Sequence, residues 1–182
     1  MKNNVIKGSI IVVFVILFLS CAVSQISAAD NATPTTMLTL SKGGVVMEYP
    51  SDWGNSKATS NDSIMAISKL DSIDSAGIGQ ININVEKRGI DQEFNAYLNS
   101  TYTSMQRDPS FHLISSGEVV VGDKTAVQYI YTSNDNGVER EHKAVWFDSG
   151  GEVYVVMYSA PTDQFEANSY IFDYILSQIK IP

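Results

Sequence analysis

The sequence predicts an α+β domain in which an antiparallel sheet carries helices packed on both of its faces. Three observations predict this class. Short apolar or alternating segments recur between residues 37 and 159 and are separated by turn signals. Segments 91–107 and 163–179 carry apolar residues at helical spacing, so two helices need a surface to cover. Residues 153–158 are apolar on both faces of a strand, which favours a central position in the sheet.

The first strands follow from turn chemistry and from alternation. Residues 37–40 and 45–49 flank Ser-Lys-Gly-Gly at 41–44, a pattern that predicts a hairpin, and 63–69 is a short strand. Segment 80–86 alternates strictly between apolar and polar residues. Its apolar side is Ile81, Ile83 and Val85, and its polar side is Asn82, Asn84 and Glu86. We expect this strand to have one face in solvent or to lie at an edge.

Later strands are paired by glycine turns. Segments 111–121 and 125–132 meet at Gly122-Asp123, and 138–147 and 152–159 flank Ser-Gly-Gly at 149–151. Asn136-Gly137 is the strongest short hairpin signal. The first helix is expected from Asp91, as N-cap, to Arg107, because Asp108-Pro109 stops it. The second is expected from about residue 163 to 179, with Thr162 as its cap.

The N-terminus has the pattern of a secretory signal. Lys2 and Lys7 precede an apolar run at 10–19, and small and polar residues follow up to Ala29. We expect a signal peptide at 1–29, a short linker at 30–36 and one domain at 37–182. The protein is thus expected to be exported, extracellular or at the cell surface, with an uncleaved anchor as the alternative. Cys21 is a candidate lipid-attachment site, but bulky Leu19 fits that pattern poorly and removal with the signal is favoured.

Charge excludes one class of partner. After removal of residues 1–29 the chain has 10 basic and 20 acidic residues, a net charge of −10. Such a surface repels phosphate backbones, so we expect no nucleic-acid partner, and membrane contact only through an uncleaved signal or a lipid. Three Asn-x-Ser/Thr sequons, at Asn31, Asn61 and Asn99, are candidate glycosylation sites in an exported chain.

A family resemblance begins at the strand end Tyr49-Pro50, which is followed by Trp53. Pro50 keeps Tyr49 extended and ends the strand, and Trp53 can then fold back onto the core. This Tyr-Pro-x-x-Trp pattern, the Gly122 turn before a strand ending in Tyr131, and the late strand 151–160 with its terminal helix resemble the PsbP-like family. The resemblance covers roughly residues 43–182.

The resemblance implies an α-β-α sandwich around a central antiparallel sheet. The best-known members of this family are extrinsic subunits of photosystem II that help to retain calcium and chloride, and others are bacterial surface lipoproteins. No residue-level motif carries the photosystem role to this chain, because fold alone does not fix function.

Candidate catalytic groups are few. His112 and His142 lack convergent partners in the sequence, and each is interpreted as a strand histidine that faces solvent. The alternating charges Glu139, Arg140, Glu141 and Lys143 are interpreted as cross-strand ion pairs. Segment 132–137 has the wrong residues for a calcium loop and is interpreted as a hairpin turn. Tyr131 and Trp146 are interpreted as core rather than as an exposed aromatic pair.

The sequence predicts no catalytic, cofactor or metal site, and three functions stay open. The first is an exported non-enzymatic binding or accessory module of the cell envelope, whose partner is an envelope or surface protein or a small ligand between sheet and helix. The second is a carbohydrate-active or other hydrolase that uses Glu139 and Glu141, which share a strand face. The third is a calcium-retaining accessory protein, which follows from the resemblance and the acidic surface.

Overall fold

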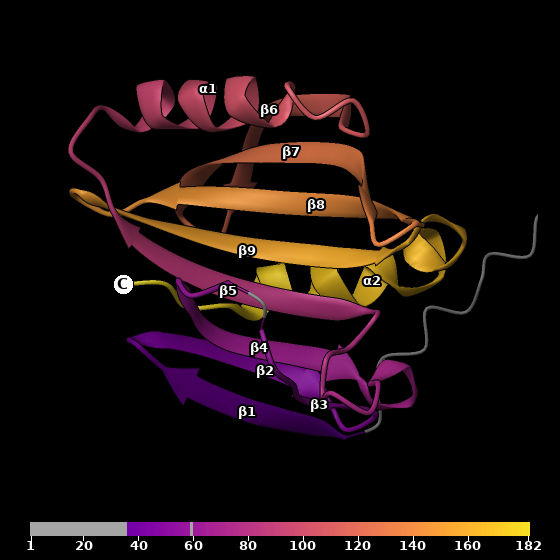
Figure 1. Ribbon diagram of the computed structural model, residues 1–182. Coiled ribbons are helices and arrows are strands. Elements are labelled where there is room, and N and C mark those ends of the chain that lie inside the picture. The colour runs from indigo at the N-terminus through magenta and orange to yellow at the C-terminus, as the bar shows by residue number, and fades with distance from the viewer. Residues whose placement is uncertain (1–35, 59) are drawn as a thin grey trace, which may run out of the picture. The chain divides into compact units, whose positions relative to one another are not determined.

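A computed structural model describes residues 36–58 and 60–182 of the chain (Figure 1). Cys21, Asn31 and the expected signal at 1–29 lie outside the described residues. The strands are β1 (Met37–Lys42), β2 (Val45–Pro50), β3 (Trp53–Asn55), β4 (Ser63–Lys69), β5 (Asn82–Gly89), β6 (His112–Val121), β7 (Lys124–Asp135), β8 (Val138–Asp148) and β9 (Glu152–Pro161). The helices are α1 (Phe94–Met105) and α2 (Thr162–Gln178), and a 3-10 turn spans Leu70–Ser72.

Seven strands form one antiparallel sheet in the order β3-β4-β5-β9-β8-β7-β6. Strand β9 lies in the middle, as its apolar faces predicted, and the predicted α+β class is confirmed. The hairpin β1-β2 forms a separate two-stranded sheet. It is tied to the C-terminus because Val46 and Lys180 exchange two main-chain hydrogen bonds of 3.0 and 2.9 Å.

The Tyr-Pro-x-x-Trp segment acts as the sequence predicted. Strand β2 ends at Pro50, and the chain turns before β3 begins at Trp53. Both Tyr49 and Trp53 are buried in the same core cluster. Within segment 132–137 the hairpin turn is confirmed at Asn136 and Gly137, which have φ of 53° and 88°, whereas residues 132–135 belong to β7. The Gly137 N–H donates to Asn134 Oδ1 at 2.7 Å.

Both helices begin at other residues than expected. Helix α1 begins at Phe94, with Glu93 as N-cap, because the Ile90 N–H bonds to the Gly151 carbonyl at 3.0 Å and keeps the chain extended past β5. Asp91 is therefore not the cap. Helix α2 already includes Thr162, whose hydroxyl donates to the Glu139 carbonyl at 3.0 Å and so does not cap the helix. Within the described residues, neither helix is long and apolar enough to cross a membrane.

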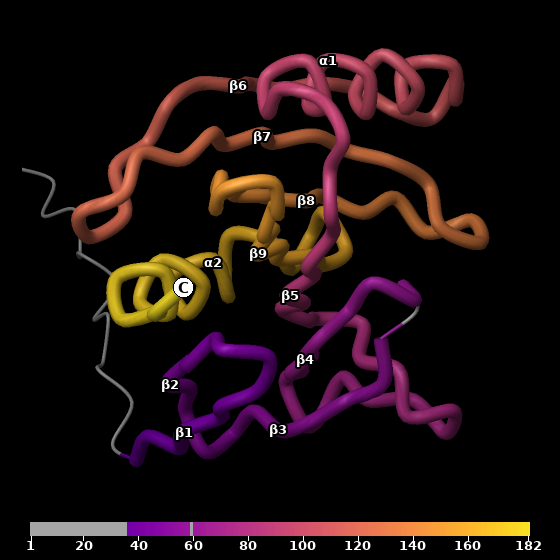
Figure 2. Tube along the Cα trace, turned by 90° about the vertical axis from the view of Figure 1, so that its left-hand side faces the viewer, coloured from indigo at the N-terminus to yellow at the C-terminus, as the bar shows by residue number. Residues whose placement is uncertain are grey.

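Alternate residues of the central strands enter two core clusters, one with each helix. Figure 2 shows the backbone course of α1, α2 and these strands. The face of the sheet that packs with α2, called the α2 face, includes Val145, Phe147, Tyr154 and Val156. The other face, called the α1 face, includes Ala144, Trp146, Val153 and Val155, which cluster with Leu98 and Tyr102 of α1. Trp146 Nε1 donates to the Tyr102 hydroxyl at 2.9 Å, and Tyr131 is buried beside them, so the core interpretation of both aromatic residues is confirmed.

Candidate functional site

A cleft of about 400 Å³ lies on the α1 face, beyond the apolar cluster of α1. The strand register places its floor there, because Asn84 pairs with Met157, His142 with Ser159, and Ser133 with Arg140. The cleft is lined by Asn82, Asn84 and Glu86 of β5, Ser133 and Asp135 of β7, Arg140 and His142 of β8, Met157 and Ser159 of β9, and by Lys57, Gly79 and Gln80 of the neighbouring loops, among others. Most of these side chains are polar.

Strand β5 supplies the polar floor through its alternation. Ile83 and Val85 point into the α2 cluster, so Asn84 and Glu86 point to the α1 face. The expectation of an edge position was wrong, since β5 lies between β4 and β9. The polar face is also less open than expected: Asn84 is only 6% exposed and Glu86 only 5%. The alternating pattern suggested that these two side chains face bulk water. In the structure their hydrogen-bond and ion-pair partners are neighbouring polar side chains.

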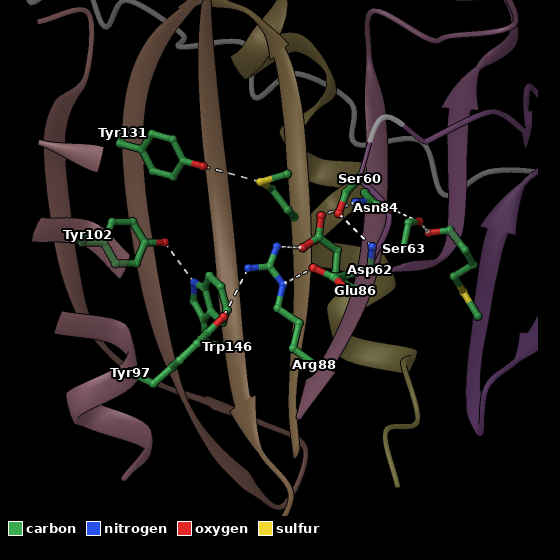
Figure 3. A network of polar contacts seen from close by, with 12 residues as sticks. Ser60, Asp62, Ser63, Asn84, Glu86, Arg88, Tyr97, Tyr102, Tyr131 and Trp146 are labelled. Carbon is green, nitrogen blue, oxygen red and sulfur yellow. Dashed lines mark hydrogen bonds and ion pairs between the residues drawn. The ribbon is translucent and has the colours of Figure 1, made fainter. Parts of the chain in front are cut away.

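Glu86 is the centre of a buried polar network (Figure 3). Its Oε1 accepts a hydrogen bond from Asn84 Nδ2 at 3.0 Å, and its Oε2 pairs with the Arg88 guanidinium. Arg88 also donates to the Tyr97 hydroxyl at 3.2 Å, which links the sheet to α1. Arg88 Nε lies 3.0 Å from Asp62 Oδ2 without the geometry of a hydrogen bond, so this contact is an ion pair only. The charge of Glu86 is therefore compensated within the protein.

His142 is held between two serines and a tyrosine. Its Nδ1 lies 2.7 Å from Ser159 Oγ, its Nε2 lies 2.9 Å from Ser133 Oγ, and its ring stacks on Tyr131 at 4.7 Å between centroids. Burial, and secondarily the charge of Arg140, lowers the pKa of His142 to about 4, so the ring is neutral at neutral pH. The expectation that His142 faces bulk solvent was wrong, because the ring is half-buried among these side chains on the floor of the cleft. His112 is exposed at the start of β6, as expected.

Arg140 is the buried cation of the cleft, with 5% exposure. It donates to Gln80 Oε1 at 3.1 Å and to the Gln80 main-chain oxygen. Burial lowers the pKa of Arg140, and the charge of Asp135 acts in the opposite direction. Sequence reasoning missed this residue because it grouped Arg140 with its charged neighbours on the strand, although the strand period places it on the opposite face from Glu139 and Glu141.

The two strand glutamates do not line the cleft. Glu139 is exposed and Glu141 half-buried, and both lie on the α2 side of β8. The pKa of Glu141 is raised by burial and then by Glu166 of α2, not by Glu139. Cross-strand ion pairs were expected for these charges. Instead, Lys143, on the same side of β8, pairs with Asp173 of α2.

The segment 74–80 leads into a wall of the cleft, which its last three residues, 78–80, line. Asp74 Oδ1 accepts hydrogen bonds from the main-chain N–H groups of Ala76 at 2.9 Å and Ile78 at 3.0 Å. Gly79 lies directly against Ser68 of β4, where a Cβ on Gly79 would be 2.0 Å from Ser68 Oγ. The segment is therefore a fixed turn that requires the small residue at Gly79.

Other candidate sites have a simple placement. The sequon residues Asn61 and Asn99 are exposed, Asn99 on α1, and their glycosylation stays a prediction, as does that of Asn31. Among residues 36–58 and 60–182, no group of three or more His, Cys, Asp or Glu side chains is arranged to hold a metal ion.

The cleft residues supply hydrogen-bond donors and acceptors, and the low pKa of His142 makes it a weak general base.

Comparison with known proteins gives the fold. No protein-family model and no curated protein sequence matches the chain. The solution structure of cyanobacterial PsbP (CyanoP) from Synechocystis sp. PCC 6803 is similar, with a TM-score of 0.57 and 16% identity over 86% of this chain and 99% of that one. LpqN, involved in cell envelope biogenesis of Mycobacterium tuberculosis, has a TM-score of 0.56 and 18% identity over 80% and 90%.

A third similar structure is PA94 from Pseudomonas aeruginosa, a protein of unknown function and putative regulator. Its TM-score is 0.50, with 12% identity over 80% of this chain and 96% of that one. At such identities the likeness concerns the fold, and the domain described here has a PsbP-like fold.

Proposed function

We propose that the protein is an exported, non-enzymatic binding module of the cell envelope that holds a small polar ligand in the cleft. The observation that carries the proposal is the cleft itself: a cavity of about 400 Å³ with a floor of polar side chains fixed on neighbouring strands. Small-ligand sites are usually preformed cavities of about this size. Their lining is mostly apolar, so the polar lining of this cleft favours a polar ligand.

The fixed geometry of the floor supports binding. Asn84, Glu86 and His142 all have hydrogen-bond partners within the protein, so their positions are set before a ligand arrives. Preorganised groups lose little conformational entropy on binding, which favours affinity. The same polar groups lack a matched acid and base. A general base works best with a pKa near the operating pH, whereas the pKa of His142 is about 4.

The envelope assignment draws on two sources. One is the pattern at residues 1–29, which is typical of a secretory signal. The other is the fold shared with LpqN, a protein involved in cell envelope biogenesis. We infer an extracellular or cell-surface location, where the ligand would be a component of the envelope. An envelope or surface protein as a further partner stays a prediction.

We also infer that the layers form the α-β-α sandwich expected from the resemblance. Packing of α1 and α2 against alternate residues of β8 and β9 supports this arrangement.

A thermal-shift screen with sugars, sugar acids, amino acids and nucleosides tests the proposal. Ser133→Trp fills the cleft from its half-buried rim, and Thr125→Trp places the same side chain at an exposed position of the same strand, away from the cleft. We expect at least one compound to raise the Tm of the wild type and of Thr125→Trp but not of Ser133→Trp. The proposal fails if no compound raises the Tm, or if Ser133→Trp responds like the wild type.

A further inference from the structure

Arg140 is a buried cation whose direct partners are uncharged. It is 5% exposed, and both its hydrogen bonds go to Gln80, one to the side-chain amide oxygen and one to the main-chain oxygen. No carboxylate of residues 36–58 and 60–182 lies within 4.0 Å of its guanidinium. Buried arginines are almost never found without an opposite charge, because removal of the charge from water is costly. Arg140 therefore faces the cleft as a desolvated cation without a direct counter-ion.

The other charged groups near Arg140 do not neutralise its positive charge. Glu86 is the buried carboxylate of the cleft, and Arg88 and Asn84 already compensate it. Asp135 acts on Arg140 beyond ion-pair distance, from the exposed end of β7. Lys57, also on the cleft wall, adds a second cation, whose Nζ donates to the Ala76 carbonyl at 2.8 Å. Beside the compensated Glu86, the cleft lining thus has two cations, Arg140 and Lys57, and one solvent-screened acid, Asp135.

The floor beside Arg140 suits hydroxyl groups. A neutral His142 has one N–H donor and one ring acceptor, so one of Ser133 and Ser159 donates to the ring and the other accepts from it. The accepting serine keeps its own hydroxyl hydrogen for a ligand. Asn82 Nδ2 donates to the Gly79 carbonyl at 2.9 Å and leaves its amide oxygen as an acceptor. Ligand hydroxyls, which both donate and accept, match such a mixed set.

We propose that the cleft binds a sugar that carries one anionic group, a carboxylate or a phosphate, with the anion on Arg140 and hydroxyls on Ser133, Ser159 and Asn82. This inference rests on the proposed function and names its ligand class. The planar guanidinium can present two parallel N–H donors to either kind of anion. The ligand would supply the opposite charge that the protein itself does not place beside Arg140.

Isothermal titration calorimetry of the full chain with glucuronate, glucose 6-phosphate and glucose tests the inference. We expect at least one of the two anions to bind about tenfold or more tightly than glucose, the usual effect of a charge-assisted pair in a partly desolvated site. The stronger of the two identifies the carboxylate or the phosphate as the anion. Arg140→Gln should remove this advantage, so that this variant binds the anion no more tightly than it binds glucose.

Three variants keep the test decisive. Lys57→Gln removes the same charge from the cleft wall, and because Lys57 is exposed we expect a smaller loss than for Arg140→Gln. Arg140→Lys keeps the charge without the planar fork, so it should retain part of the advantage even if Arg140→Gln fails to fold. Asp135→Asn should strengthen the preference for the anion.

The outcomes separate this inference from the proposed function. Equal affinities for glucose and both anions would overturn the anionic class and leave a ligand-binding cleft standing. An anion preference that survives in both Arg140 variants would overturn the role of Arg140. No binding of any of the three compounds would overturn the sugar class, while the thermal-shift screen decides independently whether the cleft binds another ligand.

Discussion

His142 and Ser159 lie directly opposite each other on β8 and β9, and His142 Nδ1 is 2.7 Å from Ser159 Oγ. This pair closes the floor of the cleft at the centre of the sheet. The ring is held in its neutral form because the cleft buries it beside Arg140, which lowers the pKa to about 4. The floor of the cleft is thus built on the same strands that carry the core.

The fold should lose stability as the pH decreases, because the pKa of His142 is low in the folded state. The unfolded chain takes up a proton on this ring as pH falls from 6.5 to about 4, whereas the folded chain resists it. The folded state therefore loses up to about 3 kcal/mol relative to the unfolded state across this window. His142→Gln keeps a polar side chain without this titration. Urea unfolding at both ends of the window should show a smaller loss in the variant, and equal losses would contradict the low pKa.

Gly79→Ala should destabilise the wall of the cleft. The new Cβ would lie 2.0 Å from Ser68 Oγ and 2.1 Å from Ser68 Cβ, so β4 or the segment must move. We expect a loss of about 2 kcal/mol, the usual size for overpacking, measured by urea unfolding. Gly117→Ala is the matched control, because nothing lies within 4 Å of its Cβ. Recovery of stability in Gly79→Ala with Ser68→Gly would confirm the contact, and lack of recovery would contradict it.

Glu86→Ala should destabilise the fold more than the loss of an exposed ion pair does. It leaves the Arg88 guanidinium without its buried partner, since the Glu86 side chain is 7% exposed. We expect a loss of about 1–3 kcal/mol, because the buried Asn84 amide loses its acceptor while Arg88 keeps Asp62 and Tyr97. Asp71→Ala breaks the exposed pair with Lys69 and should change stability by less than about 1 kcal/mol. Similar values for the two variants would show that the network around Glu86 is not a stabilising unit.

Tyr102→Phe tests the link between α1 and the sheet. The Trp146 indole N–H donates to the Tyr102 hydroxyl at 2.9 Å in the buried cluster. Removal of that hydroxyl leaves a buried donor unpaired, which costs about 1–3 kcal/mol. Urea unfolding followed by tryptophan fluorescence measures the loss. Unchanged stability would mean that Trp146 finds another partner or water.

Much of the fold could be predicted from turns and periods. The Gly43-Gly44 and Asn136-Gly137 turns, the central position of β9 and the burial of Trp53 all follow from local sequence. The short strand β3 and the separate sheet of β1 and β2 could not be predicted, because both depend on which strands meet in space. Helix starts shifted for the same reason, since Thr162 bonds to Glu139 of another element.

The site was harder to predict than the fold. The alternation at 80–86 correctly placed Asn84 and Glu86 on the face opposite the apolar residues. It did not predict that they are buried, because that depends on partners such as Arg88, which in turn contacts Tyr97 of α1. The partners of His142 lie on two other strands, at a register that the sequence does not specify. Strand period alone could have set Arg140 apart from Glu139 and Glu141, and this signal was available in the sequence.

The most direct test of the central claim is an amide NMR titration of the protein with glucuronate and, in a second sample, with glucose 6-phosphate. We expect at least one of the two compounds to cause amide shifts that concentrate at the cleft, at residues such as Gly79, Ser133 and Ser159, and we expect Ser133→Trp to abolish them. Shifts that concentrate instead on the α2 face, near Glu141 and Asp173, or that persist in Ser133→Trp, would contradict a ligand site in this cleft.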